Sequence, residues 1–161
     1  MIYVSVGKMP IGFDRLVEAA DEMARDIGDD VFIQSGSSPY RPMNAQYKDF
    51  VTFPEAEELQ ARASVIVSHA GIGTIIGALR SGTPIVIVPR REKYKEHFTD
   101  HQMEIADALR ERRGVMVVED VRELPGAVRR LMGMKGLMRP ERPGGGIIAG
   151  ILEFLDGKSG R

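Results

Sequence analysis

Two short apolar segments separated by a glycine-rich turn constrain the fold of this chain more than any other feature. Residues 65–68 (VIVS) and 85–88 (IVIV) are apolar runs, and the turn SHAGIGT and a short helical segment lie between them. Apolar strands joined through a helix are typical of a parallel sheet that is buried on both faces. Polar residues after the two strands should then meet at the carboxyl edge of the sheet, where such folds bind ligands.

The rest of the chain repeats this alternation of strand and helix. Further strands are predicted at residues 2–6, 31–34, 50–53 and 115–118. Helices are predicted at residues 13–27, 54–62, 74–80, 98–112, 120–131 and 147–155. Phe98 should begin the buried face of one helix, and Asp120 with Glu123 resembles a capping box before another. The pattern predicts an α/β fold with a doubly wound, Rossmann-like parallel sheet.

The domain organisation is simple. We expect one α/β domain over residues 1–134, a Gly- and Pro-rich connector over 135–146, and a carboxyl-terminal helix and tail over 147–161. The last helix carries an apolar stripe that either packs on the chain's own sheet or docks on a partner. This stripe consists of Ile147, Ile148, Ile151, Leu152 and Leu155. Left without a partner, it could drive formation of a homo-oligomer.

Composition narrows the classes of partner and chemistry. The 161 residues have a net charge of −1 at pH 7, which gives no electrostatic basis for binding nucleic acid. The absence of cysteine excludes disulfides, thiolate metal sites and a cysteine nucleophile. No signal-peptide pattern opens the sequence, and no apolar run approaches the roughly 20 residues that span a bilayer. We therefore expect a cytoplasmic protein that associates with membranes only peripherally.

The turn that follows residues 65–68 is a candidate anion site. Gly71 and Gly73 would let a ligand approach the backbone, and free N–H groups at the start of the next helix favour a diphosphate. Glycines in such a turn can also serve packing alone. The loop that begins with Gly7 and Lys8 lies on the same edge and is either a second ligand loop or an ordinary turn. A complete G-x-G-x-x-G pattern with its acidic partner is absent, as are the P-loop and G-x-S-x-G motifs, which argues against NAD, P-loop and hydrolase sites.

A polar segment follows residues 85–88. His97, Asp100, His101 and Glu104 are spaced to share one face at the start of a helix. They could hold zinc, form a solvated helix start, or contact a polar ligand. The zincin motif is missing, so we favour a polar ligand over a metal. Arg90 and Arg91 precede them and could face a phosphate, although basic residues on a surface usually have no such role.

These motifs together resemble glycosyltransferase family 28, and most closely its small single-domain members. The resemblance rests on VSVG at residues 4–7, SHAGIGT at 68–74, GTPIVIVPR at 82–90 and EHFTDHQ at 96–102. It implies the carboxyl-terminal, nucleotide-sugar-binding half of a GT-B enzyme, with a UDP-sugar as substrate and no cofactor or metal. The implied donor-binding residues are Gly7, Lys8, Ser68, His69, Gly71, Gly73, Thr74, Arg90, His97, Asp100, His101 and Gln102. The first glycine-rich turn would lie at the diphosphate and residues 97–102 at the sugar.

One departure from the family pattern affects the function. Full-length members carry a glutamate in the helix after the glycine turn that holds the ribose hydroxyls, and Gly77 stands at that position here. The acceptor-binding half, which usually supplies the catalytic base, is also missing.

The leading hypothesis is an inverting hexosyltransferase subunit that transfers N-acetylglucosamine or a related sugar to a lipid-linked acceptor. It would act with a membrane-anchored, acceptor-binding partner that also carries the base. The alternatives are a non-catalytic nucleotide-sugar-binding or regulatory subunit, and a UDP-sugar hydrolase or epimerase that uses His97 or His101.

Overall fold

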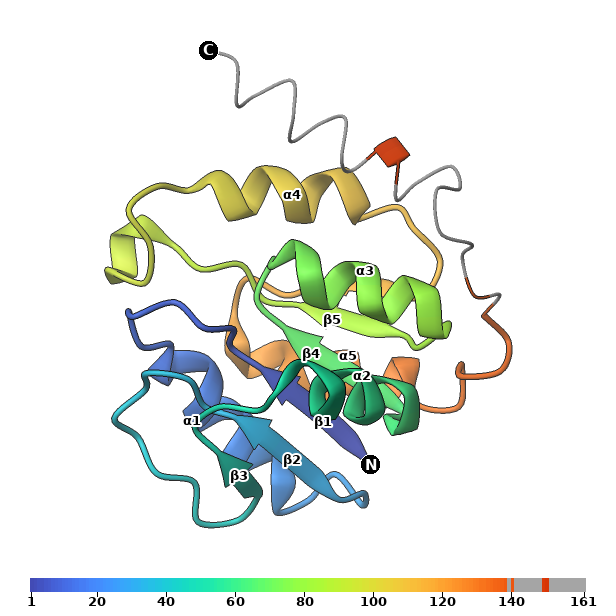
Figure 1. The fold of residues 1–161 in the computed structure, drawn as a ribbon, viewed down its shortest axis with the longest axis horizontal. Helices are drawn as coiled ribbons and strands as arrows, with labels where there is room; N and C mark the ends of the chain where they lie inside the picture. The colour runs from blue at the N-terminus through green and yellow to red at the C-terminus, as the bar shows by residue number, and fades with distance from the viewer. Residues whose placement is uncertain (139, 141–148, 151–161) are drawn as a thin grey trace.

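The computed structural model describes residues 1–138, 140 and 149–150 (Figure 1). Within them, a sheet of six strands has the order β3-β2-β1-β4-β5-β6, and every pairing is parallel. The strands are β1 (Ile2–Ser5), β2 (Val31–Gln34), β3 (Gln46–Lys48), β4 (Val65–Ser68), β5 (Ile85–Ile87) and β6 (Val115–Val117). The helices are α1 (Asp14–Ala24), α2 (Phe53–Arg62), α3 (Ile72–Ser81), α4 (His101–Leu109) and α5 (Leu124–Leu131), with 3₁₀ turns η1 (Glu92–Tyr94) and η2 (Val121–Glu123). The prediction of a doubly wound parallel sheet is confirmed.

The sheet reverses its direction of growth between β1 and β4. Ile2 pairs with Val65 and Ser5 with Ser68, so the carboxyl ends of the two strands are level. From this central pair the chain adds β2 and β3 on one side, and β5 and β6 on the other. The loops after β1 and β4 therefore diverge and open a crevice at the carboxyl edge, which is the usual ligand site of this architecture.

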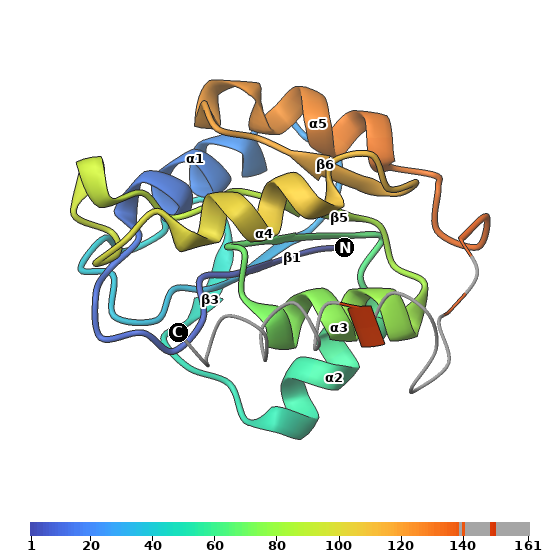
Figure 2. The same cartoon turned by 90° about the horizontal axis from the view of Figure 1, so that it is seen from above.

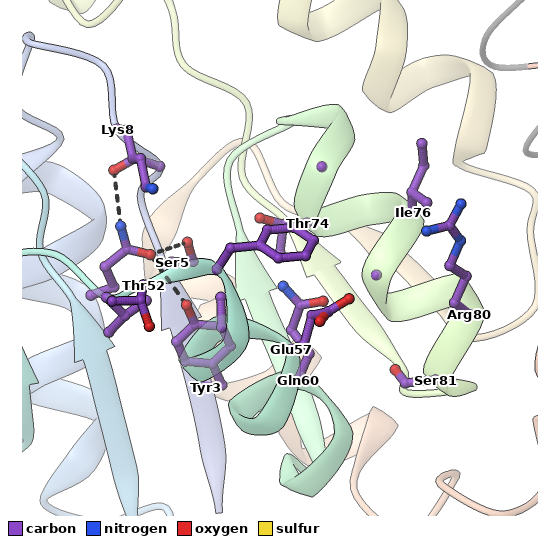
Figure 3. A pocket seen from close by; sticks show the side chains of 17 residues that line it. Tyr3, Ser5, Lys8, Thr52, Glu57, Gln60, Thr74, Ile76, Arg80 and Ser81 are labelled. Carbon is purple, nitrogen blue, oxygen red and sulfur yellow. Dashed lines mark hydrogen bonds between the residues drawn. The ribbon is translucent and has the colours of Figure 1, made fainter.

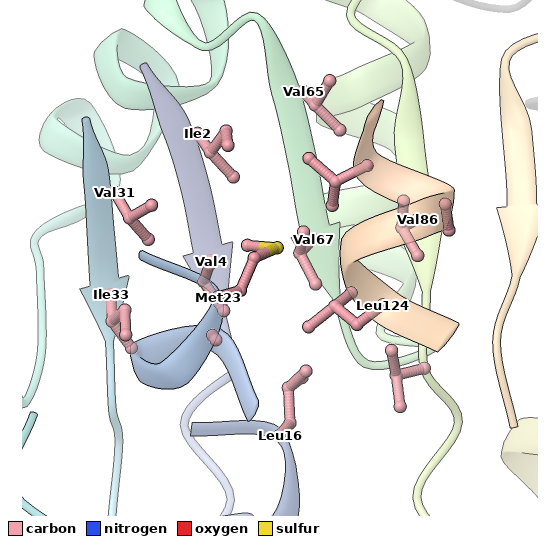
Figure 4. Packing of buried hydrophobic residues seen from close by; sticks show 14 of the residues in the cluster. Ile2, Val4, Leu16, Met23, Val31, Ile33, Val65, Val67, Val86 and Leu124 are labelled. Carbon is pink, nitrogen blue, oxygen red and sulfur yellow. The ribbon is translucent and has the colours of Figure 1, made fainter. Parts of the chain in front are cut away.

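Helices cover both faces of the sheet, and the alternation of side chains along each strand separates two cores. Ile2 and Val4 pack with α1 and α5, whereas Tyr3 belongs to the cluster formed with α3 and α4. Figure 2 shows α1 and α5 on one side of the sheet and α2 and α3 on the other. Figure 4 shows the first core, in which Leu16 and Met23 of α1 face valines and isoleucines of four strands. Burial of these strands on both faces explains why their sequences are almost continuously apolar.

Three predicted elements differ from the structure. The third strand is β3 rather than residues 50–53, because Thr52 accepts a hydrogen bond from Glu55 N and caps α2 at this point. The helix predicted from Phe98 begins only at His101, and Phe98 is 77% exposed rather than buried. Asp120 caps the turn η2 by accepting from the backbone N–H of Arg122, and α5 starts afterwards. At Thr52 and Asp120 a side-chain hydrogen bond to the backbone outweighs the periodicity of apolar residues.

The predicted boundary at residue 134 lies close to the limit of the described structure. Lys135 donates hydrogen bonds to the carbonyls of Ala61 and Ala63, so the start of the predicted connector lies against the end of α2. Most of the predicted connector and all five apolar residues of the predicted final stripe lie outside the described residues. The connector, the final helix and their role therefore remain predictions.

A buried carboxylate on α1 fixes the loop between β2 and β3. Asp21 is 0% exposed and accepts hydrogen bonds from the backbone N–H groups of Met43, Asn44 and Ala45 and from the hydroxyl of Tyr40. Burial raises the pKa of Asp21, but these hydrogen bonds lower it more, so that the pKa lies below its ordinary value. The ionised carboxylate thus holds the backbone of this loop in place through hydrogen bonds.

We predict that Asp21→Asn destabilises the fold by about 2–3 kcal/mol, because the amide nitrogen of the buried side chain would face N–H and O–H donors that it cannot accept from. The free energy of unfolding from urea denaturation measures this loss. Glu22→Gln, at the exposed neighbouring position, is the control and should change stability by less than about 0.5 kcal/mol. Equal stability of the two variants would contradict the assigned role of Asp21.

Candidate functional site

A cavity of about 580 Å³ opens between α2 and α3 and reaches the carboxyl end of β1 (Figure 3). Its volume is in the range of small-ligand sites. β1 and the following loop contribute Tyr3, Ser5, Gly7 and Lys8, and α3 contributes Gly73 and Thr74. The cavity thus lies beside the point where the sheet reverses, as the topology predicts.

The floor of the cavity is polar and hydrogen-bonded within itself. The side-chain oxygen of Gln34 accepts hydrogen bonds from the hydroxyls of Tyr3 (3.2 Å) and Ser5 (3.0 Å). The amide nitrogen of Gln34 donates to the carbonyl of Gly7 at 3.3 Å. Burial raises the pKa of Tyr3, so its hydroxyl stays protonated at neutral pH. Figure 3 shows these hydrogen bonds as dashed lines beside Tyr3 and Ser5.

The two helical walls differ in character. α2 presents Glu57 and Gln60, whose side chains extend toward α3 in Figure 3. α3 presents two glycines one turn apart, Gly73 and Gly77. A Cβ atom at Gly73 would have no heavy atom within 4 Å among the described residues, so this helix start is bare toward the cavity. The charged side chains of the lining are Lys8, Glu57 and Arg80.

His69 explains why two other glycines are required. A Cβ atom at Gly7 would lie 2.6 Å from the imidazole, and one at Gly71 would lie 2.2 Å from it. The ring therefore occupies the space that side chains at both positions would need. Its Nδ1 lies 3.3 Å from Ser68 Oγ. Burial, together with the positive charge of Arg90, lowers the pKa of His69 to about 4, so the ring is neutral at pH 7.

Arg90 is fully buried and is bonded to the protein's own backbone. Nη1 donates to the carbonyls of Ile11 (2.9 Å), Gly12 (3.0 Å) and Glu96 (3.1 Å), and Nη2 donates to that of Val6 (2.8 Å). Burial lowers the pKa of Arg90 to about 10, which leaves it charged at neutral pH. The guanidinium thus joins the β1–α1 loop to the β5–α4 loop. It does not face the cavity, in contrast to the predicted phosphate contact.

A second arginine strengthens the same junction. Arg15 of α1 binds both carboxylate oxygens of Glu96, at 2.8 and 2.9 Å, and donates to the carbonyl of Pro89. Its guanidinium also lies 4.8 Å from the ring centre of Tyr94 in η1. Glu96 is 5% exposed, so this bidentate pair is shielded from water and holds the β5–α4 loop against α1.

The polar segment before α4 does not form the shared helical face predicted for it. His97 and Asp100 precede the helix, and Asp100 accepts hydrogen bonds from the backbone N–H of Glu92 and the side chain of Arg91. His101 opens α4 and lies 3.6 Å from Glu104. Among the described residues, no group of three or more His, Asp or Glu side chains is placed to hold a metal ion.

Gln102 is buried, and its side-chain oxygen accepts from the backbone N–H of Arg90 at 3.0 Å. It therefore helps to hold the end of β5.

Comparison with known proteins identifies the family. The model of the glycosyltransferase family 28 C-terminal domain matches residues 1–136. The chain belongs to this family.

A curated relative and several solved structures agree with this assignment. Over 71 residues the chain is 42% identical to "UDP-N-acetylglucosamine transferase subunit ALG13" of Cryptococcus neoformans var. neoformans serotype D, an alignment that covers 42% of this chain and 34% of the relative. The glycosyltransferase CalG4 superposes with a TM-score of 0.64 at 20% identity, covering 84% of this chain and 35% of CalG4. VinC, solved in complex with DTDP, gives 0.59 at 24% identity, covering 82% of this chain and 33% of VinC. The fold is that of one half of a GT-B glycosyltransferase.

Within this family 28 domain, only part of the predicted donor site lines the cavity. Gly7, Lys8, Gly73 and Thr74 do so. The remaining predicted residues lie outside the lining, namely Ser68, His69, Gly71, Arg90, His97, Asp100, His101 and Gln102.

Sequence reasoning missed the polar floor and the α2 wall. Tyr3 and Ser5 carried a usable signal, since they are polar side chains at alternate positions of an apolar strand. Glu57 and Gln60 carried none, because polar residues of a short amphipathic helix are normally solvated.

Among the described residues, no helix is both long and apolar enough to cross a bilayer.

The neutral state of His69 makes a prediction about pH. An imidazole with an ordinary pKa of 6.5 takes up a proton in the unfolded chain well before the folded chain does at about pH 4. Stability should therefore fall between pH 7 and pH 5, with about 2 kcal/mol of the loss due to this group. Denaturant unfolding at both pH values measures the loss.

His69→Asn provides the comparison, because an amide does not titrate in this range. The variant should be less stable at pH 7 but lose less stability than the parent between pH 7 and pH 5. Identical losses in the two proteins would contradict a buried neutral imidazole.

Proposed function

We propose that this chain binds the nucleoside diphosphate of a UDP-sugar between α2 and α3, and that it is the donor-binding subunit of a hexosyltransferase. The observation that carries the proposal is the cavity at the start of α3, where Gly73 is bare and Lys8 lies at the rim. Backbone N–H groups at a helix start and one lysine suit a diphosphate. The polar floor and the α2 wall leave room for a nucleoside alongside.

The family and the relative named as a UDP-N-acetylglucosamine transferase subunit support N-acetylglucosamine or a related sugar as the transferred group. We propose that the sugar passes with inversion to a hydroxyl of a lipid-linked acceptor in glycan or polysaccharide synthesis. The helix start and Lys8 would stabilise the charge that develops on the departing UDP. His97, Asp100, His101 and Gln102, on the loop and helix after β5, remain our candidates for the sugar end of the donor.

The acceptor and the catalytic base would come from a second polypeptide. The relative is named as a subunit of a UDP-N-acetylglucosamine transferase, which supports a second subunit. We propose a membrane-anchored partner that carries the acceptor site and holds this cytoplasmic chain peripherally at the membrane. A base on that partner would remove the proton of the acceptor hydroxyl.

A second candidate function is a non-catalytic nucleotide-sugar-binding or regulatory subunit. Gly77 favours it, because α3 carries no carboxylate at this position of the cavity wall. The two candidates differ in one result, which is sugar transfer in the presence of the partner.

We predict that Gly73→Val lowers UDP affinity at least tenfold, because its side chain enters the open space at the start of α3. Isothermal titration calorimetry with UDP, UDP-N-acetylglucosamine and ADP measures this. Gly126→Val is the matched control, since Gly126 is also a helical glycine with nothing within 4 Å among the described residues, and it lies on α5 across the sheet. Tighter binding of ADP than of UDP, or equal binding by Gly73→Val and the parent, would contradict the proposal.

Reconstitution tests the need for a partner. The purified chain, UDP-N-acetylglucosamine and a lipid-linked acceptor should give no product until a candidate membrane-anchored subunit is added. Full transfer by the chain alone would refute partner dependence, and no transfer with a partner that forms a stable complex would favour the non-catalytic alternative.

A further inference from the structure

An unpartnered amide lies in the wall of the cavity. Gln60 of α2 is 8% exposed and lines the cavity, and its side-chain amide forms no hydrogen bond with any described residue. Its backbone carbonyl accepts a hydrogen bond from Thr83 Oγ1 at 3.1 Å, which fixes this part of α2 to the sheet. The amide atoms are not among the fully enclosed unpaired polar atoms of the described residues, so they remain accessible from the cavity. A ligand in the cavity can therefore bond to both the oxygen and the nitrogen of this amide.

Gly77 makes room for this amide. A Cβ atom at Gly77 would lie 1.7 Å from the side-chain oxygen of Gln60 and 3.3 Å from its nitrogen. Any side chain at position 77 would therefore displace the amide. In Figure 3 the Gln60 side chain extends from α2 toward the α3 wall, beside Glu57. The absence of a side chain at Gly77 on α3 therefore allows the amide of Gln60 on α2 to lie where it does.

The position of the amide along α3 indicates which part of a nucleotide it meets. Gly77 follows Gly73 by four residues, which is about 6 Å along the helix axis. With a diphosphate at the start of α3, the next group of a nucleoside diphosphate is its ribose. A carboxamide accepts hydrogen bonds through its oxygen and donates through its nitrogen, and each of two neighbouring hydroxyls can do both. The amide therefore matches a vicinal diol.

We propose that Gln60 binds the 2′- and 3′-hydroxyls of the nucleotide ribose, and that Gly77 is required because it leaves space for this amide. This inference rests on the proposed function and names the group that distinguishes ribonucleotides from deoxyribonucleotides in the same cavity. Glu57 is the neighbouring polar group of the α2 wall, but it is exposed and can remain hydrated without a ligand. Gln60 is the more buried of the two, and its amide lies against Gly77, so it is the group of the α2 wall that a ribose beside α3 would meet.

The experiment compares UDP with 2′-deoxy-UDP by isothermal titration calorimetry. The parent should bind UDP about fivefold more tightly, which corresponds to about 1 kcal/mol for the hydrogen bond to the 2′-hydroxyl. Gln60→Leu removes the amide at similar volume, so it should abolish the preference: UDP loses its contacts through both hydroxyls, whereas 2′-deoxy-UDP loses only the contact through the 3′-hydroxyl and weakens less. Gly77→Ala should act in the same way by displacing the amide, and its folding is secured because alanine favours a helix over glycine. Glu57→Gln tests the neighbouring polar group of the α2 wall and should keep the preference. Glu58→Gln and Gly126→Ala, both outside the cavity lining, are the matched controls and should keep it too.

The outcomes separate this inference from the proposed function. Loss of the preference in Gln60→Leu and Gly77→Ala, with both controls unchanged, supports it. A preference that survives both changes, equal weakening of both ligands by Gln60→Leu, or loss of the preference in Glu57→Gln would overturn it. Equal binding of the two ligands by the parent would also overturn it while leaving UDP binding intact. Binding of neither uridine nucleotide by the parent would reject the proposed function itself.

Discussion

The buried guanidinium of Arg90 is the interaction on which the shape of the carboxyl edge depends. A charge removed from water is tolerated only when hydrogen bonds replace its hydration. Carbonyls of the β1–α1 and β5–α4 loops provide them, and the ring of Phe13 lies 4.7 Å from the guanidinium carbon. The bidentate pair of Arg15 and Glu96 closes the same junction from the side of α1. The β1–α1 and β5–α4 loops are thereby held together at the carboxyl edge of the sheet.

Packing at glycines accounts for the shape of the cavity. Gly7 and Gly71 accommodate the ring of His69, and Gly77 accommodates the amide of Gln60. Gly73 differs, since none of the described residues fills the space beside it. The glycines of this edge thus have two separate roles. Some allow side chains from neighbouring elements to approach the backbone, and Gly73 leaves the start of a helix open to a ligand.

The fold could be predicted from the sequence because burial of a sheet on both faces leaves a strong record. Short apolar runs such as residues 65–68 and 85–88 are typical of strands that are buried on both faces. Five of the six strands were therefore placed within one residue of their observed bounds. β3 was misplaced because its residues Gln46, Tyr47 and Lys48 are all exposed and leave no such record. The start of α4 was misplaced because Asp100 accepts hydrogen bonds from Glu92 N and the Arg91 side chain, which ties residues before the helix to η1.

The site could be predicted only in part, for a related physical reason. Glycine turns and polar residues after strands mark the carboxyl edge, and Gly7, Lys8, Gly73 and Thr74 do line the cavity. The sequence does not show which polar side chains turn inward to bind the protein itself. Arg90 and Gln102 look like ligand groups but bond to the backbone, whereas Gln60 looks like a solvated helix residue and is buried in the cavity wall.

The central claim is that a uridine nucleotide occupies the space between α2 and α3. Titration of the ¹⁵N-labelled chain with UDP, followed by amide chemical shifts, tests it most directly. The account predicts that the largest saturable shifts occur at Gly7, Lys8, Gly73 and Thr74 and in the first turns of α2. Shifts confined to residues 97–102, or to the opposite face formed by α1 and α5, would contradict it.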